Sequence, residues 1–170
     1  MAVESAPTNV PAPSVSGGAR RVMIATDGSE ASLTAARVAS EVFAGAEFLL
    51  VTVIDELEDP MADAGGFEGP ATNEEEAEAA YRADNVDAQG SLAATARQFG
   101  DRPVHERVVE HRGEGRGAKL CATAAEEDVA VLVVGSHGHG VLADALLGSV
   151  SNYAVHHCDR PVLVVPTRKK

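Results

Sequence analysis

The sequence predicts an α/β fold in which five parallel strands form a doubly wound sheet. Short, continuous apolar runs rich in Val, Leu and Ile alternate with longer segments whose apolar residues recur at helical spacing. Strands that are apolar throughout are typical of a parallel sheet with helices on both faces. Because the chain has 170 residues, one such domain with a tail accounts for its length.

The apolar runs themselves predict the strands. Such runs at residues 22–25, 48–54, 129–134 and 161–165 each predict one strand. Pro161 opens the last run, where a strand tolerates the missing N–H group. A further, weaker strand is predicted near 104–109.

Helices are predicted between these strands. The first follows the turn at 27–29, with Ser29 as its N-cap, and runs to about Gly45. The second covers 73–99 and has one apolar face, made of Tyr81, Ala88, Leu92, Ala96 and Phe99. A shorter helix contains Leu120 and Ala124, and the last runs from Ser149 to about His157.

The domain organisation follows from the segments that lack such patterns. Residues 1–19 are rich in Pro, Gly and small residues and are predicted to be a disordered tail, without the features of a secretory signal. Residues 20–167 are predicted to form a single domain, and 168–170 are a short basic end. Within the domain, 55–72 are predicted to be a long acidic loop.

Composition excludes several classes of function. The chain has 26 acidic and 14 basic residues, so its net charge of −12 argues against binding nucleic acid or an anionic membrane. No apolar run is long enough to span a bilayer. Cys121 and Cys158 are too few for a disulfide scaffold and fit a reducing cytosol, so we expect a cytoplasmic protein.

The segment from 131 to 165 carries the chemistry. Gly135 ends a predicted strand, Gly138 follows, and Gly148 precedes a predicted helix that begins at Ser149. Glycines let the backbone turn and approach a ligand closely, and the free N–H groups of a helix N-terminus suit a phosphate. Residues 135–151 contain no Lys or Arg, so backbone N–H groups and hydroxyls would hold that phosphate. The alternative is that these glycines only form turns and caps.

Three matches in order give the chain a resemblance to the universal stress protein family over about residues 20–166. Gly135, Gly138, Gly148 and Ser149 match the pattern G-x-x-G-x9-G-[S/T] of its nucleotide-binding members. The sequence TDGS after the first strand and the ending DRPVLVV also resemble family patterns. The resemblance implies a protein that binds ATP, or ADP or AMP, and acts as a nucleotide-dependent stress or regulatory protein.

The resemblance also implies which residues contact the nucleotide. Asp27 and the backbone around Val53 would contact adenine and ribose, and Val134 would lie against the nucleoside. The full set of implied nucleotide-binding residues is Thr26, Asp27, Val53, Val134, Gly135, Gly138, Gly148, Ser149, Val150 and Ser151, with His137 as a further phosphate contact. The family also implies a homodimer through the C-terminal strand at 161–166. This strand is expected to form an apolar edge of the sheet, and such edges tend to associate with other strands unless they are paired or covered.

Topology supports the same location for the ligand. We predict the Rossmann-like or flavodoxin-like strand order 3-2-1-4-5, whose switch point lies between the first and fourth strands. The turns at Asp27 and Gly135 would then flank one crevice. Ligands of doubly wound sheets bind in such crevices.

Other motifs support weaker hypotheses. The segment 113–119 resembles a Walker loop, but its glycine spacing is too short and Leu120 follows Lys119, so a flexible turn is favoured. His156 and His157, with Cys158, are expected to cap a helix C-terminus rather than hold zinc. No metal site built from protein ligands is predicted.

Catalysis is an open alternative to binding. No G-x-S-x-G elbow surrounds Ser149, and Asp27 is expected to position a ligand rather than act as a base. A slow ATPase, a phosphotransferase that modifies its own Ser149 or Ser151, and a cyclic-AMP sensor are the alternatives. A pure interaction module would not need the intact glycine pattern.

The net negative charge of the chain is concentrated in one segment. Residues 55–87 hold 12 acidic residues and one basic residue, Arg82. This acidic segment follows the strand that borders the predicted crevice, so phosphate would meet a negative field there. We therefore predict that a divalent cation such as Mg²⁺ accompanies the nucleotide, held by its phosphates.

Overall fold

A five-stranded parallel sheet forms the centre of the protein. In this computed structural model, which describes residues 20–57, 74–138 and 147–167, the strand order is β3-β2-β1-β4-β5. The strands are β1 (Arg21–Ala25), β2 (Glu47–Asp55), β3 (Val104–His111), β4 (Val131–Gly135) and β5 (Val162–Val165), and all neighbouring pairs are parallel. The predicted fold class and strand order are confirmed.

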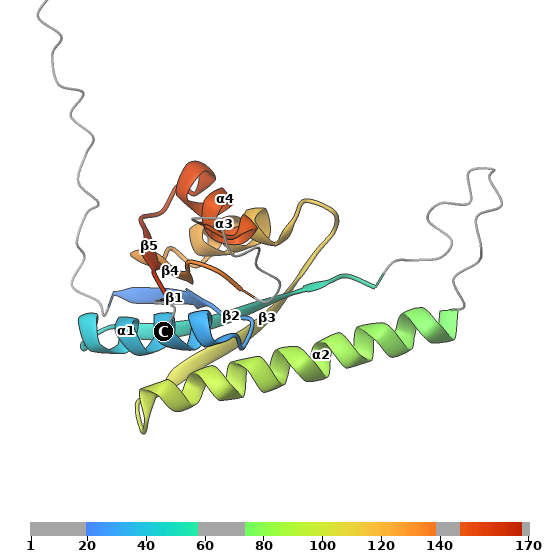
Figure 1. The fold of residues 1–170 in the computed structure, drawn as a ribbon, viewed down its shortest axis with the longest axis horizontal. Helices are drawn as coiled ribbons and strands as arrows, with labels where there is room; N and C mark the ends of the chain where they lie inside the picture. The colour runs from blue at the N-terminus through green and yellow to red at the C-terminus, as the bar shows by residue number, and fades with distance from the viewer. Residues whose placement is uncertain (1–19, 58–73, 139–146, 168–170) are drawn as a thin grey trace, which may run out of the picture.

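Helices cover both faces of this sheet (Figure 1). They are α1 (Glu30–Val42), α2 (Glu74–Ala96), which continues into a 3-10 turn at Arg97–Phe99, α3 (Arg116–Glu126) and α4 (Ser149–His157). The ends differ from the prediction by a few residues. The first helix stops before Gly45, and the fourth strand begins at Val131 because Val129 still bonds to the carbonyl of Ala124.

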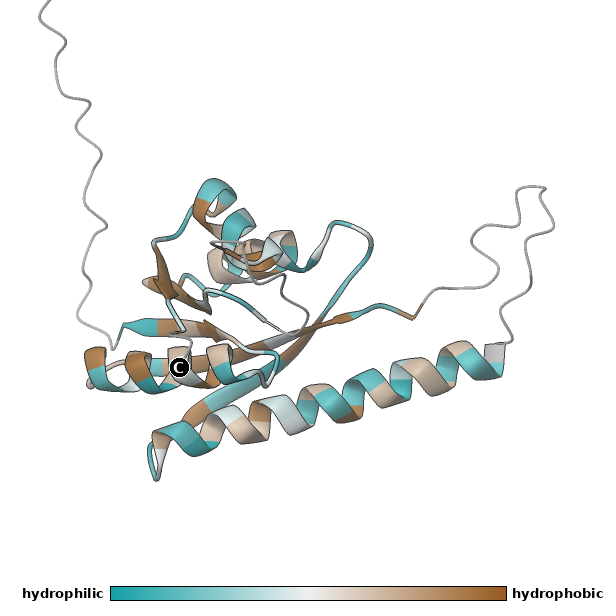
Figure 2. Ribbon diagram, in the orientation of Figure 1, coloured by the Kyte–Doolittle hydropathy of each residue, from teal (hydrophilic) through white to brown (hydrophobic). Residues whose placement is uncertain are grey.

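Each face of the sheet has its own apolar core. On one face, Ile24, Phe48 and Leu50 pack against α1 and α2, and Leu92 from α2 is buried among them. On the other face, strand residues pack against Leu120 and Ala124 of α3 and Ala154 of α4. Figure 2 shows the hydrophobic colour concentrated in the strands. The core is therefore built from aliphatic residues on strands that are buried from both sides.

The long helix α2 uses only part of its length for the core. Ala88, Leu92 and Phe99 of its predicted apolar face are buried, whereas Tyr81 reaches Glu110 on β3, with its hydroxyl 2.5 Å from the carboxylate. The N-terminal end of α2 projects past the sheet (Figure 1). The first five residues of α2 include four of its six acidic residues, Glu74, Glu75, Glu76 and Glu78.

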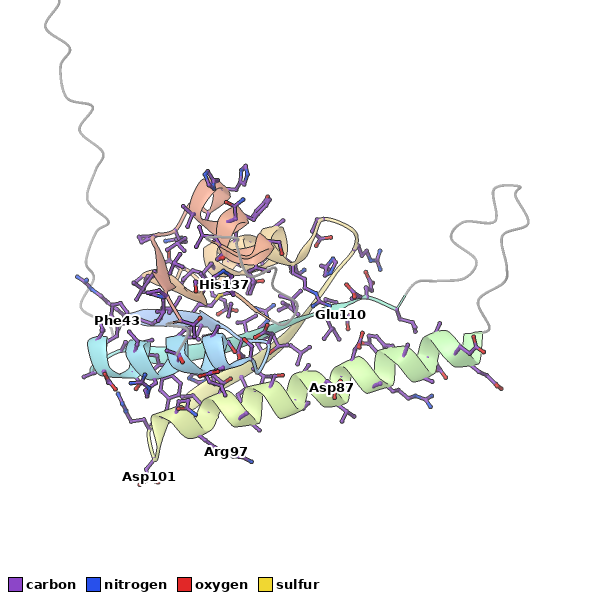
Figure 3. All side chains as sticks on the ribbon, in the orientation of Figure 1. Phe43, Asp87, Arg97, Asp101, Glu110 and His137 are labelled. Atoms are coloured by element: carbon purple, nitrogen blue, oxygen red, sulfur yellow. A yellow bond between two sulfur atoms is a disulfide. The ribbon has the colours of Figure 1, made fainter. Side chains whose placement is uncertain are left out.

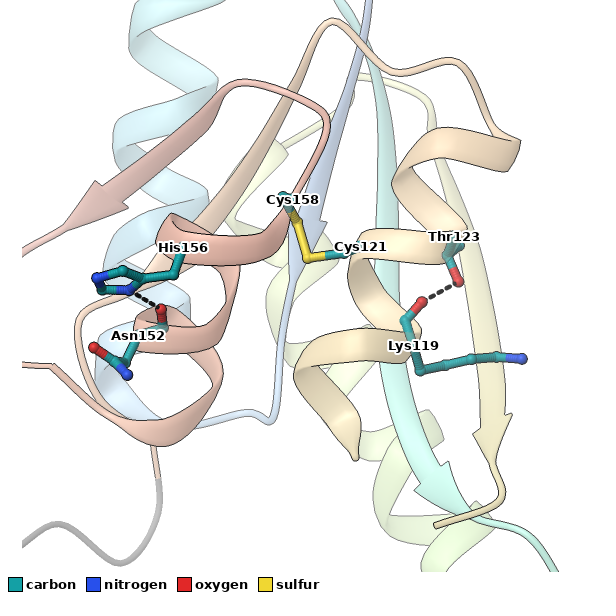
Figure 4. Close-up of a disulfide and its surroundings, with 6 residues drawn as sticks. All are labelled: Lys119, Cys121, Thr123, Asn152, His156 and Cys158. Carbon is teal, nitrogen blue, oxygen red and sulfur yellow. Dashed lines mark hydrogen bonds between the residues drawn. A yellow bond between two sulfur atoms is a disulfide. The ribbon is translucent and has the colours of Figure 1, made fainter. Parts of the chain in front are cut away.

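A disulfide joins α3 to α4, which the sequence analysis did not predict. Cys121 and Cys158 are bonded, with their Cα atoms 5.0 Å apart (Figure 4). The two residues were interpreted as fitting a reducing cytosol, and the bond does not support that reasoning. Their pairing depends on α3 and α4 lying side by side in register, which no local pattern encodes.

Several predictions concern residues outside the described part of the chain. These are the tail at 1–19, most of the acidic loop at 55–72, and the basic end at 168–170. Within the described ranges, no helix has the length and apolarity that crossing a bilayer requires.

Candidate functional site

A cavity of about 590 Å³ opens at the carboxyl ends of β1, β2 and β4. This is the switch point of the sheet, where the connections leave β1 and β4 in opposite directions. Every residue predicted to contact a nucleotide lies on its wall: Thr26, Asp27, Val53, Val134, Gly135, His137, Gly138, Gly148, Ser149, Val150 and Ser151. The structure thus brings the whole predicted set together, from four separate stretches of chain.

Asp27 is held in one orientation by the turn between β1 and α1. Its Oδ1 atom accepts hydrogen bonds from the backbone N–H of Ser29 at 3.0 Å and from the Ser29 hydroxyl at 2.6 Å. Ser29 in turn caps α1, because its side chain accepts the N–H of Ser32, as predicted. The carboxylate is therefore pre-positioned at the cavity wall.

Gly138 is a glycine because Asp27 leaves no room for a side chain. A Cβ atom at Gly138 would lie 2.4 Å from Oδ2 of Asp27, well inside contact distance. Gly135 has a different reason, since a Cβ there would lie 2.9 Å from the backbone of Ala31 in α1. The first glycine of the motif thus permits helix packing, and the second permits the loop to approach the carboxylate.

Gly148 meets no such restriction from the protein. A Cβ atom there would lie 3.4 Å from Cα of His137, an ordinary contact, and its φ of −72° suits any residue. Gly148 is the N-cap of α4, yet no side chain caps this helix. The first N–H groups of a helix have no intrahelical partners, and the residues that carry those of α4, Ser149 to Ser151, line the cavity. The absence of a side chain at Gly148 leaves space for a ligand to approach the backbone at the start of α4.

The two serines of α4 differ in what they offer. Ser149 is exposed at the cavity wall. The Ser151 hydroxyl is buried and donates to the carbonyls of Ser136 and Gly148, both at 3.0 Å. Ser151 therefore links the loop that follows β4 to α4, while Ser149 stays exposed at the cavity wall.

His137 is tied to a hydrogen-bonded junction at Ser136. Its Nδ1 atom lies 3.0 Å from the Ser136 hydroxyl, which also accepts the backbone N–H of Thr167 at 3.2 Å. His137 lines the cavity beyond the end of β4 (Figure 3). Its ring is thus positioned by the same residue that anchors the start of α4.

Thr26 belongs to a buried cluster of hydroxyl groups behind the cavity. Its hydroxyl lies 2.7 Å from that of Thr95 on α2 and 3.1 Å from that of Ser32 on α1. Its carbonyl accepts the hydroxyl of Thr52 at 2.9 Å. This network holds α1, α2 and β2 together at the base of the cavity.

The sequence analysis missed wall residues that come from α2 and α3. Asp84, Asp87 and Ser91 on α2 and Arg116 at the start of α3 line the same cavity, and Figure 3 marks Asp87 on its helix. Arg116 is the one Lys or Arg on the described wall, and it pairs with Asp55 at 3.3 Å. An isolated Arg after a glycine-rich turn was the only signal that could have indicated it.

Ion pairs lie at the end of β2, and Asp55 connects them to Arg116 on the cavity wall. Asp55 lies 2.5 Å from Nε2 of His111, and Glu56 pairs with Arg112. The Arg112 guanidinium lowers the pKa of the Glu56 carboxyl by hydrogen bonding to it. In each pair one partner, Asp55 or Arg112, is exposed, so water screens the pair and it adds little stability. They do keep the acidic end of β2 partly neutralised beside the cavity.

The described residues contain no group of three or more His, Cys, Asp and Glu side chains that could hold a metal ion. His156 bonds to the carbonyl of Asn152 at 2.8 Å, and Cys158 is the C-cap of α4, so neither is arranged as a ligand. A cation at this site would need ligands from a bound molecule.

This fold and cavity define a class of protein: a doubly wound α/β domain with a glycine-lined crevice at its switch point. The universal stress protein family model matches residues 18–166. The chain therefore belongs to the universal stress protein family.

Individual relatives agree with this assignment. A universal stress protein from Synechocystis is 43% identical over 51 residues, which cover 30% of this chain and 47% of that protein. The chain thus matches less than half the length of that relative. A universal stress protein solved in complex with cAMP has a TM-score of 0.57 at 21% identity, covering 88% of this chain and 98% of that one.

A family protein from Arabidopsis thaliana, solved with AMP bound, has a TM-score of 0.54 at 17% identity. The alignment covers 88% of this chain and 92% of that chain. At these identities the likeness to both solved structures establishes the shared fold.

Proposed function

We propose that this protein binds ATP, or a related adenine nucleotide, in the crevice between β1 and β4 and acts as a nucleotide-dependent regulatory protein of the stress response. The observation that carries the proposal is the convergence of Asp27, the glycine array and the uncapped N-terminus of α4 on one cavity. The AMP and cAMP bound to the two structural relatives support this ligand class.

The two ends of the cavity suit the two ends of a nucleotide. At one end, the N–H groups of α4 and the Ser149 hydroxyl supply donors for phosphate, with the positive end of the helix dipole behind them. Toward β2 and α3, the wall includes the apolar Val53 and Leu120, which suit a purine ring. Asp27 lies between, where a carboxylate can accept hydrogen bonds from ribose hydroxyls.

A divalent cation such as Mg²⁺ completes the proposed complex. The wall carries Asp27, Asp84 and Asp87 against a single Arg116, so an unaccompanied triphosphate would meet net negative charge. The cation would bind through the phosphates, because the described residues offer no protein cluster for it.

Analysis of the purified protein tests the proposal directly. The protein is denatured, the released small molecules are separated by chromatography, and ATP binding is measured by calorimetry with Mg²⁺ present. We expect either co-purified adenine nucleotide or saturable binding of one molecule per chain. If repeated preparations show no co-purified nucleotide and no saturable binding, the proposal is refuted.

A cyclic-AMP sensor is the second candidate, and the cAMP complex of a structural relative is the observation that favours it. The same N–H groups of α4 could hold a single cyclic phosphate. Competition titrations of ATP against cAMP distinguish the two, because the physiological ligand of a sensor should displace the other at lower concentration.

We also propose a homodimer formed through β5. This strand is at the edge of the sheet, and its residues Val162, Leu163 and Val164 are only half-buried. An unpaired apolar edge favours association with another strand. Light scattering should give the mass of two chains, and a monomer mass at every concentration would contradict this.

A further inference from the structure

We propose that the Cys121–Cys158 disulfide is a reversible redox modification site, opened by small thiols, and that its oxidised form keeps α4 in position for phosphate binding. The control of nucleotide binding rests on the proposed function. The modification and its effect on α4 do not.

The bond encloses the whole phosphate-binding segment. Cys121 lies on α3 and Cys158 is the C-cap of α4, a sequence separation of 37. Between them lie β4, the glycine array and all of α4. Figure 4 shows the bond running directly from one helix to the other. Every backbone donor proposed for phosphate is therefore inside the loop that this bond closes.

Besides the hydrogen bonds of Gly148 and Ser151 to Ser136, α4 is held mainly by its packing against α3. Only Ser151 and Ala154 of this nine-residue helix are buried, while Tyr153 and Val155 are 37% and 50% exposed. A helix of this length has little stability of its own and depends on packing. Its main neighbour is α3, which approaches so closely that a Cβ at Gly117 would lie 2.8 Å from Cβ of Tyr153. The disulfide is the covalent part of this contact.

Both cysteine residues keep part of their surface exposed to solvent. Both cysteines are partly buried and pack at the margin of the apolar cluster beneath α3 and α4, rather than inside it. Access and thiolate character govern thiol–disulfide exchange. A small thiolate can approach such a bond without global unfolding.

The exchange is balanced in atoms and electrons. A reductant thiolate attacks one sulfur, the Sγ–Sγ bond breaks, and the departing cysteine thiolate takes up a proton. A second reductant thiolate then attacks the mixed disulfide, which releases the other cysteine and forms the disulfide of the reductant. Two electrons pass to the protein, and a small-molecule disulfide reverses the reaction by the same steps.

Opening the bond should weaken nucleotide binding through α4. Without the cross-link, α4 can separate from α3 at its C-terminal end, and its N–H groups are then in position for only part of the time. The apparent affinity falls in proportion to the fraction of competent molecules. We expect at least about a fivefold loss, the lower end of typical coupling between two sites.

The test compares the full chain before and after treatment with dithiothreitol under native conditions. Alkylation with iodoacetamide, followed by mass measurement, counts free thiols. We expect none in the untreated protein and both cysteines after reduction. Reduction should also speed amide hydrogen exchange in 149–157 and weaken the affinity for Mg-ATP, measured by calorimetry.

The variant C121S/C158S is the matched control. It should resemble the reduced protein in exchange and affinity, and dithiothreitol should not change it. Three results would overturn the proposal: free thiols in the untreated protein, reduction only after unfolding, or reduction that leaves exchange at 149–157 unchanged. If exchange rises but Mg-ATP binds in neither state, the nucleotide proposal fails and the redox site stands.

Discussion

The substitution Gly148→Ala separates what the fold requires from what a ligand requires. The added methyl group fits the protein, since its nearest neighbours would be 3.4 Å, 3.5 Å and 3.8 Å away, at His137, Ser136 and Ser151. The backbone at Gly148, with φ −72° and ψ 167°, is also open to alanine. In the proposed complex, however, the methyl group would stand between the phosphate and the N–H groups of α4.

The expected effects on stability and on binding differ in size. Alanine is a poorer N-cap than glycine by up to about 1 kcal/mol. It also restricts the unfolded chain, which returns roughly 0.4–1 kcal/mol. The free energy of unfolding should therefore change by less than about 1 kcal/mol. Loss of one hydrogen bond to a charged phosphate costs about 1.5–3 kcal/mol, which corresponds to about 10- to 150-fold weaker binding.

Calorimetric titration with Mg-ATP and urea unfolding provide the two measurements. Gly45→Ala is the control, because a Cβ at Gly45 meets nothing within 4 Å and the residue lies outside the cavity. It should leave the affinity for Mg-ATP unchanged and raise the free energy of unfolding by no more than about 1 kcal/mol. Wild-type affinity in Gly148→Ala would refute the reasoning, as would a loss of stability well above 1 kcal/mol.

Three further predictions follow from the described contacts. Gly90→Ala, at an exposed position inside α2 with open space around it, should raise the free energy of unfolding by about 0.5–1 kcal/mol in urea titrations. Thr95→Val removes a buried hydroxyl that bonds to Thr26 and to the carbonyl of Ser91, and should lower the same quantity by about 1–3 kcal/mol; an unchanged midpoint would contradict this. Excess chelator should weaken ATP binding by about tenfold or more, because charge repulsion from the acidic wall is then uncompensated. Equal affinity with and without chelator would show that no cation is needed.

The fold class and strand order could be predicted because most of the signals for the elements are local. Four of the five strands contain a continuous apolar run, and α1 has its own start signal at Ser29. The cavity wall was predictable for the same reason where it follows strands, at Asp27 and Gly135. The carboxyl ends of neighbouring parallel strands meet at one edge of a sheet.

The features that escaped prediction depend on how separate elements pack. Asp84 and Asp87 reach the cavity because α2 crosses beside β2, and Arg116 does so because α3 begins there. The disulfide requires α3 and α4 to lie side by side in register. The Ser151 hydroxyl looked like a phosphate ligand, but its burial directs it to backbone carbonyls instead. None of these relations leaves a signature within a single segment.

Ser136, just after β4, makes hydrogen bonds to two other parts of the chain, the end of β5 and the start of α4. Its N–H donates to the carbonyl of Val165, its own carbonyl accepts from Gly148 at 2.8 Å and from Ser151, and its hydroxyl accepts from Thr167. The end of β5, the residue Thr167 that follows it and the first turn of α4 are therefore all bonded to one buried residue, mostly through its backbone. A movement of the first turn of α4 away from the sheet must break its bonds to Ser136. A structural change at the phosphate end of the cavity would therefore be transmitted to β5 at the edge of the sheet.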